Sequence, residues 1–189
     1  MKKKNKNIPS PRTSGVVKVP MIMQMEATEC GAACLSMVLA YYGRWVTLEQ
    51  ARMDCGISRD GSNAKNIYKA AAVYGLKAKA YRFELSTLCE KASYPCIIHW
   101  GFNHFVVLNG FCRKGAVLND PARGCMIVSV EELDEKFTGV CLMFEPGEDF
   151  RPGGAKKSIF SFAKQRLEGS RSAFLFVAAT TVAAALIGI

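Results

Sequence analysis

The chain has 189 residues, with 25 Lys and Arg against 16 Asp and Glu, eight Cys and two His. This length predicts one domain with short appendages, and an apolar fraction of one half excludes a wholly disordered chain. The formal net charge of +9 suggests a nucleic-acid partner, but residues 1–18 carry +6 and residues 150–171 carry +5, which leaves −2 for residues 19–149. Because a nucleic-acid-binding domain carries its basic residues on the fold itself, we expect no nucleic-acid partner.

The two ends of the chain differ in character. No apolar stretch of 7–15 residues follows the basic N-terminus, so we expect residues 1–16 to be a flexible basic tail that stays in the cytosol. Ala173 to Ile189 carries no charge, and a helix of this length would span about 26 Å, just short of the ~30 Å hydrocarbon core. One interpretation is a buried C-terminal helix. The absence of a polar face favours the other, in which residues 172–189 begin a first transmembrane helix and residues 149–171 form a basic cytoplasmic linker.

Between these ends, the elements expected in chain order are helices followed by strands. Thr28 is expected to cap a helix over residues 29–42 that stops at Gly43 and that, being apolar nearly all round, should lie buried at the centre. Helices first and strands afterwards predict an α+β fold in which N-terminal helices pack on an antiparallel sheet. The further helices are expected at 47–56, 63–74, 84–91 and from 129, and the strands at 76–83, 95–100, 104–111, 116–119, 124–129 and 139–144.

The eight cysteines contain no C-x-x-C pair and are scattered among apolar residues. A zinc site needs closely paired ligands, so we expect no metal site. A cytosolic domain keeps its thiols reduced, and most of these cysteines are expected to be small buried hydrophobic residues.

Four side chains are candidates for a nucleophilic site. Cys30 falls in the first turn of the first predicted helix, where unpaired N–H groups and the helix dipole favour a thiolate. His104 opens one predicted strand and Asp120 ends the next, so a tight hairpin would place them side by side as a base and its orienting carboxylate. Gln24, six residues before the cysteine, is placed to offer its amide N–H to an oxyanion, with the Cys30 backbone N–H as second donor.

Three of these four residues also have a structural interpretation. A cysteine at a helix start and a histidine on a strand are often packing residues, and Asp120 before Pro121 can simply form a turn. His99, the only other histidine, lies inside a predicted strand. The occurrence of all four groups in this order favours the chemical interpretation, with His104 as the base.

Three motifs carry a resemblance to a known family: Gln24-x5-Cys30-Gly31-x-Ala33-Cys34, Asn103-His104-Phe105-Val106-Val107-Leu108 and Asn119-Asp120-Pro121-Ala122-x-Gly124. Over residues 17–148 the sequence resembles the bacteriocin-processing double-glycine peptidases, which are papain-like domains at the N-terminus of peptidase-containing ABC transporters. Two positions depart from the commonest pattern of that family. Glu29 stands where Asp often precedes the cysteine, and Asn103 stands where Gly often precedes the histidine.

The resemblance implies a papain-like cysteine peptidase with Cys30 as nucleophile, His104 as base, Asp120 as orienting partner and Gln24 as oxyanion donor. It implies cleavage of a precursor peptide after Gly-Gly, Gly-Ala or Gly-Ser at the end of a helical leader, with no cofactor for the peptidase domain. It further implies export by an ABC transporter that is homodimeric in full length and lies in the bacterial cell membrane, with the peptidase at the cytoplasmic face. ATP would bind only to a nucleotide-binding domain outside this chain.

Two other functions remain open at this point. A domain of the same fold can bind leader peptides without cutting them, and a papain-like enzyme can transfer acyl groups from a non-peptide substrate. A helical leader should bind with its apolar side in an apolar groove. Candidates for lining that groove, each of which can instead belong to the core, are Met21, Met23, Met25, Tyr68, Tyr81, Phe83, Trp100 and Phe102.

Overall fold

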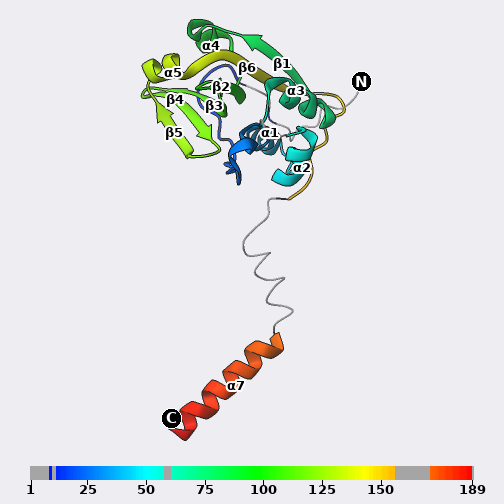
Figure 1. The fold of residues 1–189 in the computed structure, drawn as a ribbon, viewed down its shortest axis with the longest axis vertical. Coiled ribbons are helices and arrows are strands. Elements are labelled where there is room, and N and C mark those ends of the chain that lie inside the picture. Colours follow the sequence, from blue (N-terminus) through cyan, green and yellow to red (C-terminus); the bar gives the residue numbers. More distant parts are fainter. Residues whose placement is uncertain (1–8, 10–11, 58–60, 156–170, 189) are drawn as a thin grey trace. The chain divides into compact units, whose positions relative to one another are not determined.

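The structure is a computed structural model that describes residues 9, 12–57, 61–155 and 171–188 (Figure 1). It divides the chain into two units, Met1–Gly154 and Ala155–Ile189. Most of the predicted tail (1–16) and most of the predicted linker (149–171) lie outside the described residues.

Helix α1 (Cys30–Tyr41) is the central element of the first unit. All its residues from Cys30 to Ala40 are buried, as expected for a helix that is apolar nearly all round. It contacts α2 (Leu48–Asp54), α3 (Ala64–Val73) and strand β3 (His104–Cys112). Figure 1 shows α1, α2 and α3 gathered beside the sheet.

The start of α1 differs from the expected one. The cap predicted at Thr28 is wrong, because Thr28 lies inside a short 3-10 turn, η1 (Ala27–Glu29), which runs directly into the helix. The cap position of α1 is Glu29, and no side-chain hydrogen bond caps the helix there. The 3-10 turn therefore sets the entry of the chain into α1, and Cys30 is the first residue of the α-helix.

Three further helices, α2, α3 and α5 (Val130–Lys136), begin at a residue whose side chain caps the helix. The Thr47 hydroxyl accepts a hydrogen bond from a backbone N–H at the start of α2, and Asn63 caps α3 in the same way. Ser129 caps α5. These caps begin the helices within a residue of where the sequence predicts them.

Six antiparallel strands form one sheet in the order β1-β6-β2-β3-β4-β5. The last strand in sequence is thus inserted between the first two, while β2 to β5 follow each other as a meander. Helix α4 (Leu85–Lys91) contacts β6 and α5 contacts β4. The predicted fold class, helices packed on an antiparallel sheet, is confirmed. The remaining strands are β1 (Leu76–Arg82), β2 (Cys96–Trp100), β4 (Gly115–Asp120), β5 (Gly124–Val128) and β6 (Phe137–Pro146).

Extended segments at both ends of the first unit pair with its core. Before α1, isolated bridges join Arg12 to Tyr94 and Val16 to Gly110, so backbone pairing begins before the predicted domain start at residue 17. After β6, the Gly153 carbonyl accepts a hydrogen bond of 2.7 Å from the Trp45 N–H, beyond the predicted domain end at residue 148. The domain therefore includes short flanks that the residue pattern does not identify.

The second unit contains helix α7 (Arg171–Ile187). Its apolar side chains are exposed, among them Phe174, Phe176 and Leu186. No helix in the described part of the chain is both long enough and apolar enough to cross a membrane. The expectation that residues 172–189 are the beginning of a transmembrane helix stays a prediction.

Candidate active site

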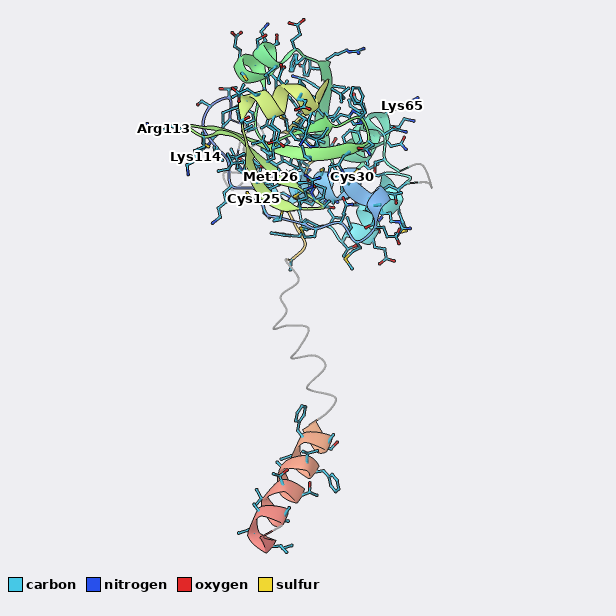
Figure 2. All side chains as sticks on the ribbon, turned by 60° about the vertical axis from the view of Figure 1, so that its left-hand side comes forward. Cys30, Lys65, Arg113, Lys114, Cys125 and Met126 are labelled. Atoms are coloured by element: carbon cyan, nitrogen blue, oxygen red, sulfur yellow. The ribbon has the colours of Figure 1, made fainter. Side chains whose placement is uncertain are left out.

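Cys30 lies inside the domain, where the N-terminal end of α1 meets the sheet. Cys30 is only 4% exposed. Figure 2 labels Cys30 within the domain, whereas Arg113 and Lys114 extend outward from the tip of the β3–β4 hairpin. The first turn of an α-helix offers N–H groups that have no intrahelical partner, so this position suits a group that becomes negative during a reaction.

His104 and Asp120 lie side by side at one end of the sheet. His104 is the first residue of β3 and Asp120 is the last residue of β4, and the two strands are antiparallel neighbours. The Nε2 atom of His104 lies 2.8 Å from the Asp120 Oδ1 atom. The same oxygen accepts a 2.8 Å hydrogen bond from the Ala122 N–H, and the carboxylate is buried. The Ala122 N–H therefore holds the carboxylate oxygen that contacts His104, and this oxygen fixes the orientation of the imidazole ring.

Cys30 and Asp120 act on His104 from opposite sides. Because Nε2 faces Asp120, the Nδ1 atom is the ring nitrogen left for Cys30. Burial acts to lower the pKa of His104, but side-chain hydrogen bonds and charges from Cys30 and Asp120 outweigh it and raise the pKa above its ordinary value of 6.5. The arrangement therefore favours a protonated imidazole beside Cys30, and a cysteine paired with a histidine in this way is the usual arrangement for nucleophilic attack on carbonyl carbon.

Gln24 reaches the same region through the extended segment that precedes η1. Its backbone N–H donates a 2.9 Å hydrogen bond to the Pro121 carbonyl, which ties it to the turn that follows Asp120. The side-chain Oε1 atom is buried and has no hydrogen-bond partner among the described residues. With that oxygen turned into the protein, the amide NH2 group is the end that remains to serve as a donor.

The cysteines nearest to Cys30 in the fold are poorly suited to act as nucleophiles. Burial, followed by the neighbouring Cys30, raises the pKa of Cys34 well above its ordinary range, and its thiol donates to the Phe105 carbonyl at 3.2 Å. Burial also raises the pKa of Cys55, to about 12. All eight cysteines are free thiols. Of these three, only Cys30 is paired with a histidine.

His99 makes its contacts with residues other than Cys30 and Asp120. Its Nδ1 atom lies 2.7 Å from the Thr138 hydroxyl, and its ring packs against Phe105 with the ring centroids 4.8 Å apart. Burial and then the charge of His104 lower the pKa of His99. The structure thus places His104, and not His99, beside a cysteine and a carboxylate.

Two features of the site are not indicated by the residue pattern: the burial of Glu29 and the backbone conformation of Phe102. The carboxylate of Glu29, directly before Cys30, is buried. Phe102, in the turn before His104, has a left-handed backbone (φ 66°) and is 83% exposed. Residues held in this backbone region cluster at active sites and at segments that clamp ligands. In the described part of the chain, no group of three or more His, Cys, Asp or Glu side chains is arranged to hold a metal ion.

Comparison with known sequences gives a consistent family. The model of the peptidase C39 family matches residues 18–149. The colicin V secretion/processing ATP-binding protein CvaB of Escherichia coli is 40% identical over 134 residues, which are 71% of this chain and 19% of that protein. The lactococcin-G-processing and transport ATP-binding protein LagD of Lactococcus lactis is 30% identical over 70% of this chain and 20% of that protein. The chain thus spans about a fifth of the length of these relatives.

Solved structures agree with this result. A double glycine motif protease from an AMS/PCAT transporter, crystallised in complex with the leader peptide, is 62% identical, with a TM-score of 0.72 over 73% of this chain and 99% of that one. The peptidase domain of Streptococcus ComA shares the fold at 22% identity, with a TM-score of 0.65 over 68% of this chain. With a match over most of the domain in sequence and in structure, the chain belongs to the peptidase C39 family, a family of cysteine peptidases.

Proposed function

We propose that this chain is an endopeptidase that cleaves precursor peptides after a double-glycine-type motif at the end of their leader. The proposal rests on one observation: Cys30, at the start of α1, lies against His104, whose Nε2 atom is 2.8 Å from the Asp120 Oδ1 atom. The 62% identity to a double glycine motif protease supports the same reaction. Gly-Gly, Gly-Ala and Gly-Ser are the sequences that we expect to be cut.

The proposed reaction begins with attack of the Cys30 thiolate on the carbonyl carbon of the second residue of the glycine pair. The carbonyl oxygen becomes an oxyanion, for which the Gln24 amide and the Cys30 backbone N–H are the proposed donors. His104 then passes its proton to the leaving amine, which releases the core peptide and leaves the leader as a thioester on Cys30.

The second half of the reaction regenerates the thiol. His104, now neutral, takes a proton from water as the water attacks the thioester carbon, and the same two donors stabilise the second oxyanion. Asp120 keeps the ring aligned through both halves, because the Ala122 N–H fixes the carboxylate independently of its bond to His104. We propose that this chemistry needs only side chains and water, with no cofactor.

Exposed apolar side chains flank the site and support a peptide substrate. Met25, in the segment between Gln24 and Cys30, is 85% exposed, and Phe102 beside His104 is 83% exposed. The leader of the precursor, bound as an amphipathic helix, would supply matching apolar side chains. Of the other candidates for the groove, Trp100 belongs to the buried core.

The same proposal extends to the setting of the domain. The relatives are transport and processing ATP-binding proteins several times longer than this chain, and the apolar side chains of α7 are exposed to solvent. We therefore propose that the peptidase is one part of a homodimeric ABC transporter, held at the cytoplasmic face of the bacterial membrane through residues 172–189. ATP would be used by a nucleotide-binding part outside this chain.

The test is incubation of the 189-residue chain with synthetic precursors that end their leader in Gly-Gly, followed by mass spectrometry of the products. We expect one cut after the second glycine and none when that glycine is replaced by leucine. Cys30→Ala should abolish the cut, whereas the matched variant Cys125→Ala, which removes an exposed thiol on β5, should cut at the wild-type rate. Intact precursor with the wild-type chain, together with leader binding, would instead show a binding domain.

A further inference from the structure

Glu29 is a buried acidic residue that the proposed reaction does not use. It directly precedes Cys30, and only 3% of the residue is exposed. Burying a carboxylate is unfavourable unless its oxygens are paired, so its partners show what the charge does in the fold. The Oε2 atom accepts two backbone hydrogen bonds, from the Met25 N–H at 2.9 Å and from the Glu26 N–H at 3.0 Å.

The other carboxylate oxygen connects the same segment to the helical layer. The Oε1 atom of Glu29 lies 3.2 Å from the Arg52 Nη1 atom, and that nitrogen is also 3.5 Å from the Glu26 carboxylate. Arg52 belongs to α2, whose position is set by its packing on α1. The carboxylate thus joins the segment before the helix, the start of α1 and the neighbouring helix α2.

The segment of residues 25–29, which the hydrogen bonds of Glu29 close into a turn, lies between the two proposed oxyanion donors. Gln24 immediately precedes the two N–H groups that Glu29 accepts, and Cys30 immediately follows Glu29. At its far side, Gln24 is tied to the Pro121 carbonyl, next to the carboxylate that orients His104. Glu29 therefore fixes the conformation of residues 25–29, which separate the two donors, while its own carboxylate is buried.

We propose that Glu29, neutralised by Arg52, is the positioning residue of the oxyanion site. It holds residues 24–30 in a closed turn so that the Gln24 amide and the Cys30 N–H converge on one oxygen. Donors must lie within a few tenths of an ångström of their place before the reaction for this stabilisation to work. This inference rests on the proposed peptidase function.

The decisive variant is Glu29→Gln, because it keeps the size of the side chain and loses one acceptor. The glutamine oxygen can accept from the two backbone N–H groups, but the NH2 group then faces Arg52, donor against donor. Loss of a single oxyanion donor costs on the order of 10²–10³ in kcat, so we expect a displaced donor to cost about 10- to 100-fold. KM should stay within about twofold, because the glutamine oxygen can keep the hydrogen bond from the Met25 N–H and so leaves Met25, a proposed substrate contact, in place.

A second measurement separates positioning from a general structural role. Iodoacetamide alkylates a thiolate by displacing iodide, and no carbonyl oxyanion forms in that reaction. We therefore expect Glu29→Gln to react with iodoacetamide at Cys30 within about twofold of the wild-type rate while peptide cleavage falls. An equal loss in both reactions would overturn the proposal. Glu132→Gln is the matched control, since it removes a carboxylate that pairs with Lys136 at 2.7 Å on α5, away from these residues; it should leave both rates unchanged.

Two further variants keep the inference open to refutation if Glu29→Gln fails to fold. Arg52 is 44% exposed, so Arg52→Ala should fold and lower kcat, whereas Arg52→Lys, which keeps one charged donor, should restore most of it. The combination of Arg52→Ala with Gln24→Ala should be no slower than Gln24→Ala, because Arg52 acts through the donor that is already removed. Additive losses would overturn the proposal. If the wild-type chain cuts the precursor and Arg52→Ala cuts equally fast, Glu29 has no positioning role; if the wild-type chain does not cut, the peptidase function itself fails.

Discussion

Asp120→Asn isolates the contribution of the carboxylate charge to the proposed site. The side chain is 3% exposed, and its Oδ1 atom accepts from both His104 and the Ala122 N–H. The asparagine oxygen can keep both contacts, so the variant removes the charge and leaves the shape. A hydrogen bond between charged partners is worth about 1.5–3 kcal/mol. Since 1.36 kcal/mol is a factor of ten in rate, kcat/KM should fall by about 10- to 150-fold.

The pH profile distinguishes this loss from an unspecific one. Asp120 is one of the groups that raise the pKa of His104, and burial opposes it. Without the carboxylate charge, the pKa of His104 falls and the imidazolium is lost at lower pH. The alkaline limb of kcat/KM, measured for precursor cleavage between pH 5 and 9, should therefore move to lower pH in Asp120→Asn. An unshifted limb, or a kcat/KM within twofold of the wild type, would refute this account of Asp120.

Three further predictions concern stability and substrate contact. The folded state raises the pKa of His104 above its unfolded value of about 6.5, so the contribution of His104 to the free energy of unfolding is complete below pH 6.5 and is lost as pH rises through the folded pKa. Urea unfolding at several pH values should show this decline in the free energy of unfolding, and the decline should be shallower in His104→Asn. Gly75→Ala should lower the free energy of unfolding by about 2–4 kcal/mol, because φ is +82° and the new Cβ would lie 2.7 Å from the Phe150 backbone nitrogen. Gly15→Ala, at φ +77° with open space around the new Cβ, should lower it by only about 1–2 kcal/mol, and equal losses in the two variants would contradict the steric argument. Phe102→Ala should raise KM about tenfold with little change in kcat or unfolding free energy, since the side chain is exposed until a substrate covers it; an unchanged KM would remove Phe102 from the substrate contacts.

Local patterns in the sequence are sufficient to predict most elements of the fold. The cap residues Thr47, Asn63 and Ser129 make the hydrogen bonds expected of them, and each helix begins next to its cap. The all-apolar helix is buried at the centre because it has no face that favours water. At Thr28 the same argument fails, because the 3-10 turn places this residue inside the turn and not at its boundary.

The residue pattern does not indicate which distant segments of the chain pair with each other. Nothing in the spacing of the strands indicates that β6 lies between β1 and β2, because this order depends on contacts between distant segments. The bond from the Gln24 N–H to Pro121 and the burial of Glu29 have the same origin. A carboxylate directly before a reactive cysteine is the one local signal for Glu29, and its partner Arg52 lies in another helix.

The most direct test of the central claim is the mass of the chain itself during the reaction. Acid quenching in a single turnover with a Gly-Gly precursor should trap the leader on the enzyme as a thioester, with the mass of the chain plus the leader less one water. Digestion should place this adduct on the fragment that contains Cys30, and Cys30→Ala should form none. Cleavage that proceeds without an adduct, or with the adduct on another residue, would contradict the assignment of Cys30 as the nucleophile.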